Sequence, residues 1–247
     1  LVLSGTQFIA NTARGVNAVG GGGLAAYNTV TLNGGLFRDN ATLNNGGGLH
    51  ANAALNLTGT LFINNTANNG GGLSQAGAGA RRVVNALFAR NTATSTLGAA
   101  LYLTATGSVQ ILHTTIGNPL LANGAAIFSG AGTVGITDTI ITNHAIGLNQ
   151  TGGTVYADYN LFFGNTTNKS GSISGGANDV SGDPRFTIPA NDDYHLQSNS
   201  AAIEAGVDVG VPIDIDGDLR PIGNSFDIGF DETAGTRSLY LPLVLRN

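Results

Sequence analysis

The stretch LNLTGTLFINNTANNGGGL, from Leu55 to Leu73, decides the fold of this chain. Its apolar residues Leu55, Leu57 and Leu61 are separated by polar ones, the period of two expected for a strand with one buried face. The asparagines that follow favour turns, because Asn tolerates positive φ and bonds to nearby backbone groups. Three glycines then permit a tight corner before the apolar pattern resumes. The stretch therefore predicts one turn of a solenoid.

The same unit recurs along the chain. Copies begin at Leu1 (LVLSGTQFIANTA), Val30 (VTLNGGLFRDNAT), Leu55 and Arg81 (RRVVNALFARNTA), and looser copies begin at Val109, Val134 and Val155. Starts spaced 21 to 29 residues apart indicate a repeat array. The leucine-rich repeat has a similar period, but its L-x-x-L-x-L spacing is absent and no segment looks helical. We therefore expect an all-β fold, a parallel β-helix of about seven coils with three strands in each.

Composition excludes several classes of protein. The 38 glycines follow no G-x-y period, which excludes collagen, and 42% hydrophobic residues exclude disorder by composition. No apolar run approaches the ~20 residues that span a bilayer, so no transmembrane segment is expected. The absence of cysteine gives no disulfide evidence for a compartment. Because the chain begins with Leu1 and shows no signal peptide, we expect a processed mature chain or a fragment.

Charge divides the chain unevenly. Residues 1–157 hold two acids against five bases, a balance of +3, and residues 158–247 hold thirteen acids against five bases, a balance of −8. The total of −5 is not the basic footprint of a nucleic-acid-binding protein. Arg81 and Arg82 could contact an anion, but we expect a solvated pair at the start of a strand.

The chain divides into three parts. Residues 1–178 carry the coil repeats, and residues 179–232 change to short apolar pairs separated by Pro, Asp and single Gly residues. A solenoid end exposes unpaired strand edges, so we expect 179–232 to form a cap of strands and turns on the last coil. Residues 233–247 are an extended apolar tail that contains SLYLPLVLRN.

Two sets of motifs resemble known families. GGGL begins at Gly21, Gly46 and Gly70, and F-x-x-N begins at Phe8, Phe37, Phe62, Phe88 and Phe162. These resemble the paired repeats of polymorphic outer membrane proteins. DPRF from Asp183, SAAIEAG from Ser200 and FDIGFDE from Phe226 resemble the C-terminal region of choice-of-anchor Q proteins. The resemblance implies an exported, right-handed, pectate-lyase-like parallel β-helix that is secreted or held at a cell surface, and it implies no activity.

Acidic residues are too rare in the repeats for the chemistry of a polysaccharide lyase or hydrolase. Such enzymes need clustered carboxylates that bind Ca²⁺ or act as acid and base, with Arg or Lys nearby. The first 157 residues hold only Asp39 and Asp138. We therefore assign no catalytic residue and expect no enzyme activity and no cofactor.

One column of residues has two interpretations. The fifth position of the repeat is occupied by Gly5, Gly34, Gly59, Asn85, His113, Asp138 and Tyr159. Stacked strands lie about 4.8 Å apart, so His113 and Asp138 could be neighbours with the chemistry of a general acid–base pair. Alternatively, a bulge turns this position outward and the pair is a surface contact. His50, His144 and His195 share no ligand spacing and are expected in surface or turn positions.

The DIDGD stretch places three carboxylates, those of Asp214, Asp216 and Asp218, beside a glycine. These residues are candidate Ca²⁺ ligands, but the glycine falls too early for the D-x-D-x-D-G loop and no bidentate Glu follows at the right distance. A polar turn is the competing interpretation, and we assign no metal.

The repeat also predicts which side chains face inward and which form a ladder. Twelve residues are expected in the core: Leu1, Leu3, Val30, Leu32, Leu55, Leu57, Val83, Val109, Ile111, Val134, Ile136 and Val155. Five asparagines are expected to stack at one corner and satisfy backbone groups there: Asn11, Asn40, Asn65, Asn91 and Asn165. Asn118 and Asn143 lie one residue early and are expected out of line.

Two functions remain open from the sequence. The first is a non-catalytic structural or adhesive protein of the cell exterior, with a surface glycan or a host surface as its partner, that self-assembles head to tail into a filament. Its predicted interface joins one end of the solenoid to the tail through Leu1, Val2, Leu3, Leu239, Leu241, Leu243 and Leu245. The rival for the tail is that it folds back on its own subunit. The second function is a carbohydrate-binding or polysaccharide-degrading β-helix.

Overall fold

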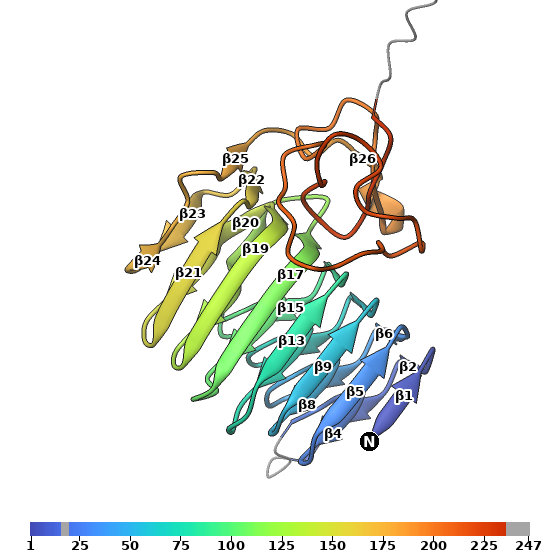
Figure 1. Cartoon of the computed structure of the whole chain (residues 1–247). Coiled ribbons are helices and arrows are strands. Elements are labelled where there is room, and N and C mark those ends of the chain that lie inside the picture. The colour runs from blue at the N-terminus through green and yellow to red at the C-terminus, as the bar shows by residue number, and fades with distance from the viewer. Residues whose placement is uncertain (16–19, 236–247) are drawn as a thin grey trace, which may run out of the picture.

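The computed structural model describes residues 1–15 and 20–235, and it is an all-β parallel solenoid of about seven turns. Figure 1 shows the coils stacked in chain order, from the blue first coil to the yellow last one, with the C-terminal part in orange and red beside the stack. The described residues contain one short 3-10 helix and no α-helix. The predicted fold class is confirmed, and the right-handed winding stays a prediction.

The largest sheet contains the first two strands of each coil, which lie on either side of the corner at the fifth repeat position. It has 14 strands, all paired in parallel with the equivalent strands of adjacent coils. Its first run holds β1 (Val2–Ser4), β5 (Val30–Asn33), β9 (Leu55–Thr58), β13 (Arg81–Val84), β17 (Ser108–Gly117), β19 (Thr133–Thr142), β21 (Thr154–Asp158) and β24 (Ile173–Ser174). Its second run holds β2 (Gln7–Ile9), β6 (Leu36–Arg38), β10 (Leu61–Ile63), β14 (Leu87–Ala89), β22 (Leu161–Phe163) and β25 (Val180–Ser181).

Two further parallel sheets complete the coils. A sheet of 4 strands holds β3 (Thr12–Ala13), β7 (Ala41–Thr42), β11 (Thr66–Ala67) and β15 (Thr92–Ala93). A sheet of 7 strands holds β4 (Leu24–Ala26), β8 (Leu49–Ala51), β12 (Leu73–Gln75), β16 (Leu101–Leu103), β18 (Ala122–Ser129), β20 (His144–Gln150) and β23 (Thr167–Ser170). The antiparallel pair β26 (Phe186–Ile188) and β27 (Asp193–Leu196), joined by helix η1 (Pro189–Asn191), stands apart from the coils.

The inward-facing residues form one column of buried side chains. Ten of the twelve predicted core residues, those from Val30 to Val155, are at most 2% exposed. Leu3 is half-buried, and Leu1 is 60% exposed, so the prediction is wrong for Leu1. The reason is that β1, which begins at the next residue, pairs on one side only among the residues that the structure describes.

The phenylalanines of the F-x-x-N motif stack through the first four coils. Neighbouring ring centroids of Phe8, Phe37, Phe62 and Phe88 lie 4.7 to 4.8 Å apart with nearly parallel planes. The last glycine of each GGGL motif faces this stack: a Cβ built on Gly48 would lie 2.8 Å from the ring of Phe62. A Cβ on Gly72 would lie 2.7 Å from the ring of Phe88. The two motifs recur together because each glycine leaves room for a ring of the next coil.

An asparagine ladder runs beside the ring stack. Oδ1 of Asn40 accepts hydrogen bonds from the backbone N–H and the amide of Asn11, and the same pattern joins Asn40 to Asn65 and Asn65 to Asn91. The side-chain amides of Asn40, Asn65 and Asn91 each also donate to a backbone carbonyl of the preceding coil. Asn165 stands apart from this run and accepts from the backbone N–H of His144.

Arg81 takes an inward position that is apolar in the previous coil. It pairs in register with Leu55 and is 2% exposed, whereas Arg82 is exposed. Its guanidinium donates to the carbonyl oxygens of Gly79 and, at 3.0 Å, Ala76, and burial lowers its pKa. The expectation of a solvated arginine pair is therefore wrong for Arg81.

Candidate functional site

The C-terminal segment, defined as residues 183–235, lies along the side of the solenoid. Its apolar side chains contact three patches of the coils. Tyr194 and Phe230 pack with Ile63, Leu87 and Ala89; Leu196, Ala202 and Ile228 pack with Ile140 and Leu161; Val211 packs with Val84 and Leu112. The segment thus covers the flank of the third to seventh coils (Figure 1), whereas the sequence predicts a cap on the last coil.

The coils meet this segment along a column of left-handed residues. The fifth repeat position has positive φ in every coil, at Gly5 (58°), Gly34 (69°), Gly59 (64°), Asn85 (47°), His113 (42°), Asp138 (51°) and Tyr159 (56°). A bulge-like corner therefore recurs at this position, and it ends the strand alternation seen in the sequence. In the later coils the column carries polar side chains that the segment covers.

His113 and Asp138 are neighbours in this column. Nε2 of His113 lies 3.5 Å from Oδ2 of Asp138, and neither side chain is exposed. Oδ1 of Asp138 accepts from the backbone N–H of Val207 at 3.1 Å, and its carbonyl accepts from Gly229 at 2.9 Å. The sequence interpretation of a surface contact is wrong, because the C-terminal segment buries the pair.

Burial sets the protonation of the pair. Desolvation raises the pKa of Asp138 to about 7, against the lowering effects of the Val207 N–H and the Arg220 charge. Desolvation and Arg220 lower the pKa of His113 to about 3. Below pH 7 the neutral imidazole and the protonated carboxyl are the favoured forms, and both side chains are buried from solvent.

Arg220 and Glu232 hold the C-terminal segment together. Nη1 of Arg220 lies 2.7 Å from Oε2 of Glu232, with both side chains fully buried. Glu232 also accepts backbone N–H groups of Asp227 and Ile222, and Asp227 in turn accepts those of Glu204 and Thr233. Burial raises the pKa of Asp227 to about 7. These hydrogen bonds and the ion pair join the FDIGFDE stretch to the rest of the C-terminal segment.

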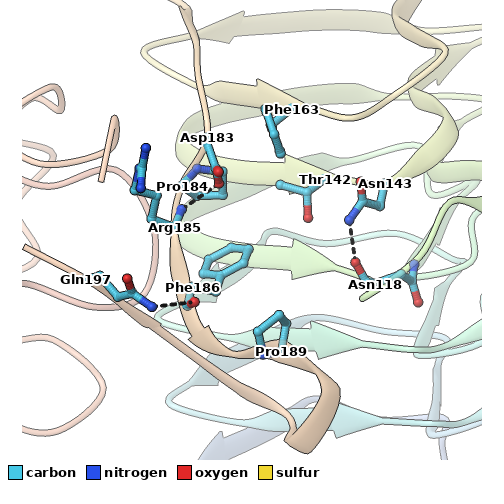
Figure 2. A pocket seen from close by; sticks show the side chains of 10 residues that line it. All are labelled: Asn118, Thr142, Asn143, Phe163, Asp183, Pro184, Arg185, Phe186, Pro189 and Gln197. Atoms are coloured by element: carbon cyan, nitrogen blue, oxygen red, sulfur yellow. Dashed lines mark hydrogen bonds between the residues drawn. The ribbon is translucent and has the colours of Figure 1, made fainter. Parts of the chain in front are cut away.

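A pocket of about 300 Å³ opens between the coils and the start of the C-terminal segment (Figure 2). The coils supply one wall and the segment supplies the other. The lining residues are Asn118, Thr142, Asn143 and Phe163 on the coil side, and Asp183, Pro184, Arg185, Phe186, Pro189 and Gln197 on the segment side. Sequence reasoning missed this pocket, although the DPRF motif that resembles a known family forms most of the second wall.

The DIDGD stretch forms a turn around Asp214. Oδ1 of Asp214 accepts the backbone N–H groups of Asp216, Gly217 and Asp218, and Oδ2 accepts that of Glu232. These bonds occupy the carboxylate of Asp214. Because Asp216 turns towards His195 and Asp218 is exposed, the three candidate ligands do not converge on one point.

A different trio is close enough to hold a metal. His195, Asp216 and Asp231 each offer a ligand atom within 4.8 Å of the others. Nδ1 of His195 lies 2.7 Å from Asp193, as in sites where a carboxylate orients the ligating ring. The same contacts form a set of ion pairs: burial lowers the pKa of His195, but the Asp193 bond and the charges of Asp231 and Asp216 outweigh it and raise the pKa.

His50 and His144 are buried as well, against the expectation of surface or turn positions. His50 is 3% exposed and its Nδ1 lies 3.3 Å from Oγ of Ser74. His144 is 1% exposed, and its Nε2 lies 2.9 Å from Nδ2 of Asn118. His144 occupies the ladder position of its coil, one residue after the left-handed Asn143.

The residues of the predicted self-association interface divide between the first coil and the tail. Val2 is 70% exposed, Leu1 is 60% exposed and Leu3 is half-buried. Leu239, Leu241, Leu243 and Leu245 lie outside the described residues, as does most of the predicted tail. The part of the chain that the structure describes contains no helix that could span a lipid bilayer.

Comparison with known proteins found no similar one. No protein-family model, no curated protein and no solved structure matches this chain.

Proposed function

We propose that this chain is a non-catalytic structural or adhesive protein of the cell exterior, and that copies associate through the first coil. The observation that carries the proposal is the row of strand edges there. β1, β2, β3 and β4 each pair with one strand, from the second coil, and their other edges have no partner among the described residues. Free edges of this kind are templates for a further strand.

The side chains of the first coil add an apolar surface to these edges. Leu1, Val2 and Ile9 are 60%, 70% and 48% exposed, and within the described part of the chain the ring of Phe8 stacks on that of Phe37 alone. A second copy that continued the stack would cover this surface. The resemblance of the GGGL and F-x-x-N repeats to polymorphic outer membrane proteins supports a place at the cell surface, with a right-handed winding.

The polar groups of the coils support a non-catalytic role. Asp39 is exposed and accepts a hydrogen bond from Asn64, whereas Asp138 is buried at a different corner, so the two carboxylates cannot act on one substrate. Asp158 accepts backbone N–H groups of Tyr159, Gly176 and Asn178. No cofactor enters this proposal.

Two measurements test the proposal. Light scattering and negative-stain electron microscopy of the purified chain are expected to show concentration-dependent assembly, with filaments one solenoid wide. A strictly monomeric protein at all concentrations would contradict the association. The alternative function is a carbohydrate-binding or polysaccharide-degrading β-helix. A degrading enzyme would release unsaturated or reducing ends from acidic polysaccharides with added Ca²⁺, and we expect no such release.

A further inference from the structure

The pocket in Figure 2 combines two kinds of surface. The ring of Phe163, 40% exposed, and the rings of Phe186, Pro184 and Pro189 give it apolar faces. Asn118, Asn143 and Gln197 add amides, and Asp183 adds a carboxylate. A binding site with apolar faces and a few convergent polar groups is the general form of small-molecule sites in proteins.

The polar groups of the pocket have unused hydrogen-bonding capacity. Asn143 donates from Nδ2 to the carbonyl of Asn118, and Gln197 donates from Nε2 to that of Phe186. Within the described residues, no hydrogen bond reaches Oδ1 of Asn143, Oδ1 of Asn118 or Oε1 of Gln197. Oδ1 of Asp183 accepts the N–H of Arg185, and its Oδ2 accepts no hydrogen bond from the residues that the structure describes. The site therefore offers a surplus of acceptors for a ligand rich in O–H donors.

The wall of the pocket also contains a buried hydroxyl without a partner. Thr142 is 1% exposed, and its Oγ1 makes no hydrogen bond in the described structure. Unsatisfied buried polar groups are few in native proteins, because each costs free energy. Asn143 beside it has a φ of 58°, the left-handed conformation that Asp39, Asn64 and Arg90 also adopt at this corner of the repeat, so the repeat itself fixes the position of this pocket residue.

We propose that this pocket binds one monosaccharide unit of a glycan. The C–H face of a sugar ring would lie against Phe163 or Phe186, and its hydroxyls would donate to Asn118, Asn143 and Asp183. A volume of about 300 Å³ is at the lower end of ligand pockets, which suits a single sugar and not a long chain. An acidic ligand is disfavoured, because Asp183 faces the space while the guanidinium of Arg185 points away from Thr142 (Figure 2).

This inference rests on the adhesive part of the proposed function and names its ligand class. Its site lies on the flank of the fifth to seventh coils, away from the first coil. A protein that assembles but binds no sugar would overturn the pocket proposal and leave the association intact. A protein that binds sugar but stays monomeric would overturn the association and leave the pocket proposal intact.

Saturation-transfer NMR and calorimetry with the full chain test the proposal. The probes are the methyl glycosides of glucose, galactose, N-acetylglucosamine and galacturonic acid, at millimolar concentration. At least one neutral glycoside is expected to bind. Asn143→Gly removes an amide without left-handed strain and is expected to weaken binding about threefold to tenfold, the effect of one net hydrogen bond. Phe163→Ala is expected to weaken it at least as much.

Matched variants outside the pocket are the controls. Asn64→Gly removes an exposed asparagine with the same backbone conformation (φ 54°), and Tyr156→Ala removes an aromatic ring that is 56% exposed. Both are expected to bind the probe like the parent protein. The proposal is overturned if no glycoside binds, if only the galacturonide binds, or if Asn143→Gly and Phe163→Ala leave the affinity unchanged.

Discussion

Nε2 of His113 and Oδ2 of Asp138 lie 3.5 Å apart in consecutive coils, with no exposure of either side chain. Both residues are left-handed, at φ 42° and 51°, and both face the C-terminal segment. The segment reaches them through the backbone N–H groups of Val207 and Gly229 and the ring of Phe226, whose centroid is 6.3 Å from that of His113. The pair is therefore an attachment point between solenoid and segment.

The two partners have opposite effects on how stability depends on pH. Asp138 has a folded pKa of about 7, raised from 3.8, so its contribution to stability is complete below pH 3.8 and is lost as pH rises through 7. His113 has a folded pKa of about 3, lowered from 6.5, so its contribution is complete above pH 6.5 and is lost as pH falls through 3. Between these limits the two slopes oppose each other.

Asp138→Asn removes one of these slopes. Between pH 4 and pH 7 we expect the free energy of unfolding of the variant, relative to the parent, to rise by about 1 kcal/mol per pH unit, since one proton fewer is linked to folding. The raised pKa values of Asp227 and Asp231 act in both proteins and cancel in the difference. Denaturant unfolding at several pH values measures this difference.

The matched control for this experiment is Asp218→Asn. Asp218 is exposed, and its carboxylate makes no hydrogen bond within the described part of the chain. As an exposed surface change, it is expected to lie within about 0.5 kcal/mol of the parent in the free energy of unfolding. A stability difference between Asp138→Asn and the parent that does not change with pH would contradict the raised pKa of Asp138.

Asn65→Ala tests the ladder. The amide of Asn65 donates to the carbonyl of Phe37 and to Asn91, and its Oδ1 accepts from the backbone and amide of Asn40. The residue is fully buried, so the change leaves partners unsatisfied, and we expect a loss of about 1–3 kcal/mol in the free energy of unfolding. The control is Asn56→Ala on the exposed face of β9, expected to lie within about 0.5 kcal/mol of the parent.

Phe62→Ala tests the ring stack. Phe62 lies between Phe37 and Phe88 at centroid distances of 4.8 and 4.7 Å and is fully buried, so its removal is expected to cost about 3–5 kcal/mol. Phe8→Ala removes the terminal, half-buried ring and is expected to cost less in the monomer. Denaturant unfolding at low protein concentration measures both losses in the free energy of unfolding. Equal losses for the two variants would contradict a larger contribution from the ring that is buried between two others.

The sequence predicted the parts of this fold that repeat. Strand alternation, the F-x-x-N and GGGL motifs and the spacing of the copies are local, and each coil contacts its nearest neighbours, so a local pattern carries the architecture. The buried Arg81 could not be found this way, because its position depends on the carbonyls of Ala76 and Gly79 in a loop. His144 likewise fills a ladder position because Asn118 bonds to its ring.

The placement of the C-terminal segment could not be predicted, because its contacts have no repeat and span long distances in sequence. Arg90 forms a two-point ion pair with Asp192, at 2.7 and 2.6 Å, across 102 residues. Asn85 bonds to Ile213 across 128 residues, and Thr115 to Phe230 across 115. The pocket lies between the coils and the C-terminal segment. The sequence contains the residues of each wall, but it does not predict that the two walls face each other.

If copies associate through the first coil, a change on the surface of that coil is expected to block assembly. Val2 is 70% exposed on the edge strand β1, so Val2→Lys adds a charge to a free edge without disturbing the core. We expect the variant to keep the stability of the parent and to stay monomeric in sedimentation and light scattering. Leu43→Lys, at a residue that is 68% exposed in the second coil, is the control and is expected to assemble like the parent.

A chain that lacks residues 238–247 tests which part of the neighbouring copy contacts the first coil. If the tail of one copy pairs with β1 of the next, the contact is head to tail and propagates, and the truncated chain is expected to be folded and monomeric. Mixed with the parent protein, it can receive a tail but not supply one, so it is expected to shorten the filaments. Assembly of the truncated chain to the same extent as the parent would exclude the tail as the joining strand. A tail packed on its own subunit, seen by cross-linking within one copy only, would contradict the head-to-tail contact and favour the fold-back arrangement.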